Sequence, residues 1–227
     1  MYSQFIIQVR YLAVVIYFRM GMKISGRRWN MIYLTGDTHN DFSKLSNKSL
    51  KKHNLKLTED DYIIVAGDFG LCWAHDKTFD WNCKWFAERS FTTLWVQGNH
   101  ENYDMIAEYP LEEWHGGLVR HIVRDKVILL ERGQIFKIDG HTFFTFGGAA
   151  SHDIPGSALD RNDPKFEIKL KERRRDWIPY RIIGESWWPQ EIPTEQEMQT
   201  GIDNLAKADF TVCLLYTSPS PRDMRRS

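Results

Sequence analysis

The residues best suited to chemistry lie in three short runs: Gly-Asp-Thr-His at 36–39, Gly-Asp-Phe-Gly at 67–70 and Gly-Asn-His-Glu at 98–101. Asp37 and Asp68 are 31 residues apart, and so are Asp68 and Asn99. Carboxylate oxygen, amide oxygen and imidazole nitrogen together suit divalent Mn, Fe or Zn. The runs therefore predict a site for two divalent metal ions, provided that the fold brings them together.

Each run directly follows an apolar stretch that reads as a β-strand, at residues 31–34, 62–66 and 93–96. The spacing leaves room for a strand, a helix and the next strand, which is typical of parallel strands joined by crossovers. Loops at the carboxyl ends of parallel strands face one crevice. We therefore expect the two Asp, the two His and the Asn to converge in space.

The order D-x-H, then G-D, then G-N-H-[DE] resembles the motif set of the calcineurin-like metallophosphoesterases, over residues 31–212. The resemblance implies a metal-dependent phosphoester hydrolase with a four-layer αββα sandwich. It also implies the metal ligands. Asp37 and His39 would hold the first ion, Asp68 would bridge both ions, and Asn99 would bind the second.

The resemblance implies a mechanism as well. Two cations lower the pKa of a shared water, and the resulting metal-bridging hydroxide would attack phosphorus in line. His100 is the expected catalytic residue, which would face the phosphate and either stabilise charge or protonate the leaving group. Glu101 would either orient His100 or begin a helix. The expected cofactors are two divalent ions, Mn²⁺ first, with Fe or Zn²⁺ as alternatives.

A second pair of motifs lies further along the chain. Gly-Gly-Ala-Ala-Ser-His-Asp at 147–153, and Trp-Trp at 187–188 followed by Glu191, resemble paired motifs of one branch of this family. The resemblance would place His152 and Asp153 beside the metals as substrate-binding residues. The alternative is a turn and a Trp pair that covers the core. The charged run at 165–175 indicates a solvated helix or loop, and a patch that binds a phosphate substrate is the alternative.

The substrate class stays open among phosphomonoesters, phosphodiesters, nucleotides and phosphoproteins. Asp68 is followed by Phe-Gly-Leu rather than the V-D-R-G run of phosphoprotein phosphatases, which disfavours the last class. A small phosphorylated molecule is the expected partner. The 30 basic and 30 acidic residues balance, so no basic excess indicates nucleic-acid binding. The alternative function is a catalytically inactive relative that binds metal or phosphate, or an inactive truncated fragment.

The order of elements predicts an α/β fold, βαβαβ first and then antiparallel strands. Helices are expected at 41–50, 79–89, 102–108 and 194–206, and later strands at 127–130, 135–138 and 141–146. Asp139-Gly140 predicts a tight hairpin turn. Trp81, Trp85 and Phe86 share one helical face, which predicts that all three lie in the core.

Both ends of the chain are expected to lie outside the domain at 31–212. Residues 1–30 would be a leader or a mis-extended start, with Met1, Met22 or Met31 as the native start. Their apolar run at 12–18 is too short to span a bilayer, and a membrane-surface anchor is the alternative. Cys72, Cys83 and Cys213 are too few and scattered for a disulfide framework, which favours a cytoplasmic protein.

The expected C-terminal limit rests on two observations. The family's two later His-containing blocks are missing, and residues 213–223 read like a translated sequencing adapter. Residues 213–227 would then be a non-native tail that packs against nothing. The domain would be truncated and lack its C-terminal strands.

Overall fold

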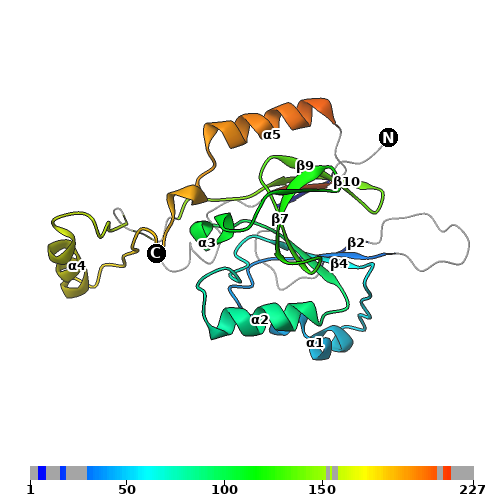
Figure 1. Cartoon of the computed structure of the whole chain (residues 1–227), viewed down its shortest axis with the longest axis horizontal. Helices are drawn as coiled ribbons and strands as arrows, with labels where there is room; N and C mark the ends of the chain where they lie inside the picture. The colour runs from blue at the N-terminus through cyan, green and yellow to red at the C-terminus, as the bar shows by residue number, and fades with distance from the viewer. Residues whose placement is uncertain are drawn as a thin grey trace, which may run out of the picture.

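The computed structural model describes residues 5–8, 16–18, 30–151, 154, 158–208 and 212–215. Two β-sheets lie face to face, with α1 (Asn47–Lys52) and α2 (Lys77–Ala87) below one sheet and α5 (Glu195–Lys207) above the other (Figure 1). The layers therefore run helix, sheet, sheet, helix. The predicted α/β sandwich is confirmed.

The larger sheet has the order β2-β3-β4-β5-β8-β7-β6. Its strands are β2 (Ile16–Phe18), β3 (Ile32–Thr35), β4 (Tyr62–Ala66), β5 (Thr92–Val96), β8 (Val127–Leu130), β7 (Gly117–Val123) and β6 (Glu112–Trp114). β3, β4 and β5 are parallel neighbours, as predicted. Their apolar residues are buried on both faces because the second sheet covers one face and helices cover the other.

Two features of this sheet differ from the expectation. β8 pairs in parallel with β5, although antiparallel pairing was expected in the second half of the chain. The β6–β7 hairpin was not predicted at all. Its strands carry mixed polar and apolar residues, and its turn relies on positive φ at His115 and Gly116.

The smaller sheet has the order β1-β11-β10-β9. Its strands are β1 (Phe5–Gln8), β11 (Val212–Leu215), β10 (His141–Phe146) and β9 (Gln134–Ile138). β9 and β10 form an antiparallel hairpin. Asp139 and Gly140 both have positive φ, so the predicted tight turn is confirmed.

The structure corrects the expectation that both chain ends lie outside the fold. β1 and β2 come from residues 1–30, and β2 pairs with β3. β11 takes in Cys213 and Leu215, and its Leu214 is fully buried between the sheets. The expectation that residues from 213 onward pack against nothing is wrong for this strand. β11 pairs in parallel with β10, and its residues are apolar.

The helices differ from the prediction mainly at their edges. The helix expected at 41–50 is divided into η1 (Ser43–Leu45) and α1, because Ser46 caps the start of α1. Trp81 of α2 is 62% exposed, so its predicted core position is wrong, whereas Phe86 is buried. α3 (Tyr103–Ala107) is shorter than expected. α5 begins with the predicted capping box between Thr194 and Glu197.

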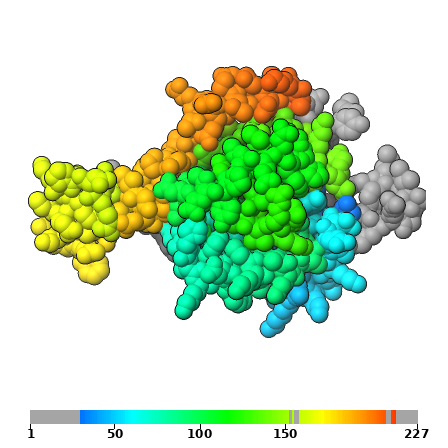
Figure 2. Space-filling view, viewed as in Figure 1, coloured from blue at the N-terminus to red at the C-terminus, as the bar shows by residue number. Residues whose placement is uncertain are grey.

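The segment between β10 and α5 leaves the body of the molecule. It carries α4 (Phe166–Arg175), which projects to one side in the space-filling view (Figure 2). Phe166 and Leu170 of α4 pack against Leu159, so this segment has a small core of its own. The segment returns to the body through η2 (Pro189–Glu191). No helix among the described residues has the length and apolar character needed to cross a membrane.

Candidate active site

The three polar runs lie side by side at the carboxyl ends of β3, β4 and β5. Backbone hydrogen bonds join the first two runs: His39 N–H donates to the Asp68 carbonyl at 2.9 Å, and Asn40 N–H donates to the Phe69 carbonyl at 3.1 Å. Gly67 N–H donates to the Val96 carbonyl at 2.9 Å, which connects the second run to the strand before the third. The convergence expected from parallel strands is therefore present in the backbone.

The backbone at this edge is strained. Asp37, His39, Asn40 and Asp68 all have positive φ, between 44° and 64°, a conformation that non-glycine residues seldom adopt. Each such residue costs on the order of 1–3 kcal/mol and persists only where its surroundings hold it. The hydrogen bonds between the runs supply that restraint. Strain concentrated in this way is typical of functional sites.

Asp68 lies at the centre of the site and is almost fully buried. Its Oδ1 accepts a hydrogen bond from His100 N–H at 2.9 Å, and its Oδ2 lies 3.7 Å from His39 Nε2. The rings of His39 and His100 meet edge to face, with centroids 5.4 Å apart. A Cβ atom on Gly98 would lie 1.9 Å from Asp68 Oδ1, so this approach requires glycine.

Asn99 is buried and points toward the end of β10. Its Nδ2 donates to Ser151 Oγ at 3.1 Å. Ser151 follows the Gly-Gly-Ala-Ala stretch at 147–150, and it contacts Glu191 through both its backbone and its side chain. Asp37 lies on the first run, and its N–H donates to the Gly67 carbonyl at 3.3 Å. His152 and Asp153, the predicted substrate-binding residues, lie outside the described residues.

Glu101 has a role that the sequence did not indicate. It is almost fully buried, and its carboxylate accepts hydrogen bonds from Phe69 N–H at 3.0 Å and Gly70 N–H at 3.4 Å. Burial, reinforced by the negative charge of Asp68, raises the pKa of Glu101 to about 8. Asn102, not Glu101, caps α3. Glu101 thus fastens the second run to the third.

The Trp pair belongs to the packing of the site's rim. Trp188 is buried, its ring lies 5.5 Å from that of Trp73, and its Nε1 donates to Asp104 Oδ2 at 2.8 Å. The interpretation of Trp188 as a core-covering residue therefore fits the structure. The motif that contains Trp188 also contains Glu191. Glu191 accepts a hydrogen bond from Ser151, and Ser151 accepts one from the candidate ligand Asn99.

The model of the calcineurin-like phosphoesterase family matches residues 31–221. The chain belongs to this family. The match covers the three polar runs and extends through β11, into residues assigned above to a non-native tail. Neither the curated proteins nor the solved structures compared with the chain gave a significant match. As a calcineurin-like phosphoesterase, the chain belongs to a group of hydrolases that generally act on phosphoesters with divalent metals.

The side chains of this calcineurin-like phosphoesterase suit divalent metals by type. Ligand atoms about 2.0–2.2 Å from one ion lie roughly 3–4 Å from each other, and the His39 Nε2 to Asp68 Oδ2 distance of 3.7 Å falls in that range. Across the described residues, however, no three His, Cys, Asp or Glu side chains form a group that could hold an ion as they stand. The amide oxygen of Asn99 is outside that residue set and would add a further ligand.

A pocket of about 300 Å³ opens beside His39 and His100. His39 and His100 line one part of it, while Trp73 and Phe79 line another. This volume is at the lower end of the range for small-molecule sites. The pocket therefore combines two imidazole rings with an aromatic wall.

Proposed function

We propose that this phosphoesterase hydrolyses small phosphoesters in the pocket beside His39 and His100, with two divalent metal ions as cofactors. The observation that carries the proposal is the position of Asp68. Its buried carboxylate contacts the third run through His100 N–H and lies near His39 of the first run. This position supports the proposal that Asp68 offers one oxygen to each of two ions.

The proposed ligands are those expected from the motifs. Asp37 and His39 would hold one ion, Asn99 the other, and Asp68 would bridge them. Mn²⁺ is the proposed metal, with Fe and Zn²⁺ as alternatives, because the donor set mixes hard oxygen with imidazole nitrogen. Bound ions would neutralise phosphate charge and supply a hydroxide nucleophile near neutral pH.

His100 is the proposed catalytic residue. Its ring borders the pocket, and its backbone is held by Asp68 Oδ1. An imidazole in this position can stabilise the charge that develops on phosphate or give a proton to the leaving oxygen. The leaving group would rest against Trp73 and Phe79, which favours substrates with a small apolar or aromatic part.

A hydrolysis assay with two chromogenic substrates tests the proposal. Chelator-treated protein would be assayed on p-nitrophenyl phosphate and bis(p-nitrophenyl) phosphate, with and without added Mn²⁺. We expect Mn²⁺-dependent hydrolysis of at least one ester. Changing a residue behind a metal ligand typically lowers activity by roughly 10–100-fold. Asp68→Asn changes a proposed ligand itself, so its hydrolysis rate should fall by more than that. Asp203→Asn, the same change on the exposed surface of α5, is the matched control.

Two results would contradict the proposal. Hydrolysis that persists equally without metal and in Asp68→Asn would show that this site is not responsible. Tight Mn²⁺ binding at Asp68 without turnover on either ester would favour the alternative function, a catalytically inactive metal-binding relative.

A further inference from the structure

A chain of hydrogen bonds runs from the candidate ligand Asn99 to a buried carboxylate. Asn99 Nδ2 donates to Ser151 Oγ at 3.1 Å, and Ser151 Oγ donates to Glu191 Oε2 at 2.7 Å. Ser151 N–H donates to the other oxygen, Glu191 Oε1, also at 2.7 Å. Glu191 and Asn99 at the two ends of the chain are buried, and Ser151 between them is half-buried.

The direction of this chain follows from the single proton of the Ser151 hydroxyl. That proton is donated to Glu191 Oε2. The hydroxyl then presents a lone pair to Asn99, which can be met only by the NH₂ end of the amide. The amide oxygen must therefore face away from Ser151.

We propose that Ser151 and Glu191 are positioning residues that orient the Asn99 amide, so that its oxygen is presented to a metal ion. The inference rests on the proposed function in one respect: it takes Asn99 as a metal ligand. Residues behind metal ligands commonly fix ligand orientation in this way. Neither Ser151 nor Glu191 needs to touch the ion or the substrate.

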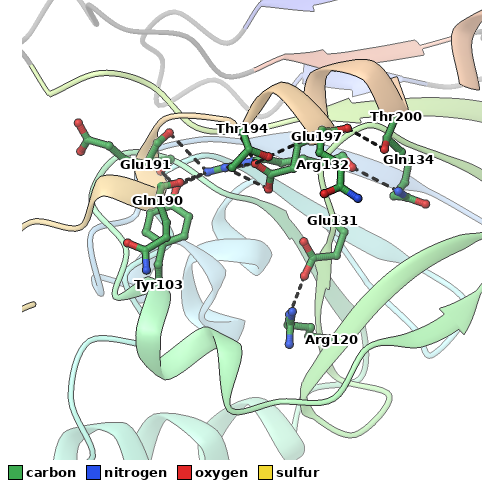
Figure 3. Close-up of polar contacts among 12 residues, drawn as sticks. Tyr103, Arg120, Glu131, Arg132, Gln134, Gln190, Glu191, Thr194, Glu197 and Thr200 are labelled. Carbon is green, nitrogen blue, oxygen red and sulfur yellow. Dashed lines mark hydrogen bonds and ion pairs between the residues drawn. The ribbon is translucent and has the colours of Figure 1, made fainter. Parts of the chain in front are cut away.

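A second network holds the residues around Glu191 in place. Arg132 Nη2 donates to the Gln190 carbonyl and to Tyr103 Oη, both at 2.8 Å, and the Tyr103 hydroxyl donates to the Gly98 carbonyl at 2.6 Å. Figure 3 shows Arg132 at the centre of this group, with Gln190 and Tyr103 on one side and Glu197 on the other. Arg132 is almost fully buried and also pairs with Glu197 at 3.3 Å.

The two networks together connect both sides of Asn99 to the same support. Hydrogen bonds through Tyr103 and Arg132 connect the Gly98 carbonyl to the Gln190 carbonyl. Hydrogen bonds through Ser151 connect the Asn99 side chain to Glu191. Gly148 makes this packing possible, since it has a φ of 94° and a Cβ there would lie 2.4 Å from the Glu191 carbonyl. Both ends of the segment that carries α4 are therefore fastened to the loop of the candidate metal ligand.

The first test uses the unmodified protein without metal. The side-chain NH₂ protons of Asn99 would be followed by ¹⁵N-resolved NMR. We expect slow solvent exchange for the proton bonded to Ser151, in contrast to exposed amides such as Asn162. Rapid exchange of both Asn99 protons would overturn the proposal. This measurement needs neither a metal nor a variant, so it stands even if the proposed function fails.

The second test measures Mn²⁺ binding by calorimetry in Ser151→Ala, Ser151→Thr and Glu191→Gln. Ser151→Ala removes the acceptor for Asn99, so one Mn²⁺ site should weaken by roughly 10–100-fold while the other keeps its affinity. Glu191→Gln should weaken the same site, because the new amide can donate to Ser151 and reverse the hydroxyl. Ser151→Thr keeps the hydroxyl and should restore binding to near the unmodified value.

Ser90→Ala is the matched control, because Ser90 also donates a hydroxyl bond, to the Leu57 carbonyl at 2.9 Å, at the opposite end of β5. It should leave both Mn²⁺ affinities unchanged. Unchanged affinities in folded Ser151→Ala would contradict the proposal, as would equal weakening of both sites. An unmodified protein that binds no Mn²⁺ would instead contradict the proposed function, and the amide exchange would then decide the orientation of Asn99.

Discussion

His39 Nε2 lies 3.7 Å from Asp68 Oδ2, although the two residues belong to loops that follow different strands. The contact exists because β3 and β4 are parallel neighbours and the loop after β3 donates backbone hydrogen bonds to the loop after β4. Both residues have positive φ. The geometry gives this edge an imidazole and a carboxylate at a separation suited to one metal ion.

Replacing His100 with Ala tests the division of labour at the site. The proposed role of His100 is toward phosphate rather than metal, so Mn²⁺ affinity should stay near that of the unmodified protein. Turnover should fall by roughly 10²–10⁴-fold, as expected when a general acid is lost. Calorimetry and steady-state kinetics on the same preparation measure both effects. Loss of Mn²⁺ binding with His100→Ala would assign this residue to the metal instead.

Replacing Glu101 with Ala tests its role as a clamp between loops. The N–H groups of Phe69 and Gly70 would lose their acceptor inside the protein, and each buried orphan donor costs about 1–3 kcal/mol. The free energy of unfolding, measured with denaturant, should fall by an amount of that order. Glu113→Ala, an exposed Glu on β6, should change stability little. Equal stability of both variants would show that Glu101 is dispensable to the fold.

The pocket wall predicts a dependence on the organic part of the substrate. Trp73→Ala should raise KM for an aromatic phosphoester by roughly 2–10-fold, which corresponds to the loss of one aromatic contact. Inhibition by inorganic phosphate, which has no group to place on the wall, should stay the same. A parallel loss of affinity for phosphate and ester would mean that Trp73 supports the loop rather than the substrate.

His121 provides a pH dependence away from the site. Its side chain on β7 is nearly inaccessible to solvent, and burial together with the charge of Arg124 lowers its pKa below the usual value. As pH falls, His121 is therefore protonated at a higher pH in the unfolded chain than in the folded protein. The stabilising contribution of the neutral ring is present above about pH 6.5 and is lost as pH drops through the lowered folded pKa.

The stabilising contribution of neutral His121 can be measured from the free energy of unfolding at about pH 7.5 and at about pH 5.5. Histidine charge changes between these two values. Replacing His121 with Gln should reduce the loss of stability between these two conditions. A variant whose stability falls with pH as steeply as that of the unmodified protein would show that other groups dominate.

The parts of the fold that could be predicted from sequence are those where local pattern and burial agree. The apolar runs of β4 and β5 and the turn at Asp139-Gly140 follow from residue type. β6 and β7 were missed because strands at the sheet's margin carry mixed side chains. Trp81 was misplaced because α2 packs against the sheet with only part of its aromatic face.

The candidate site could be predicted at the level of the three runs but not of their supports. Ser151 and Glu191 are 40 residues apart in sequence, and only the return of the α4 segment to the sheet edge brings them together. The motifs that contain Ser151 and Glu191 predicted a functional region here, but the residues expected to act in it were His152 and Asp153. The clamp at Glu101 was hidden because its burial depends on contacts between loops.

The measurement closest to the central claim is anomalous diffraction from crystals grown with Mn²⁺. We expect two peaks about 3.5–4 Å apart. The Asp68 carboxylate should lie between them, with Asp37 and His39 at one peak and Asn99 at the other. Peaks remote from Asp68, or crystals saturated with Mn²⁺ that show no peak beside it, would contradict a metal centre at this edge of the sheet.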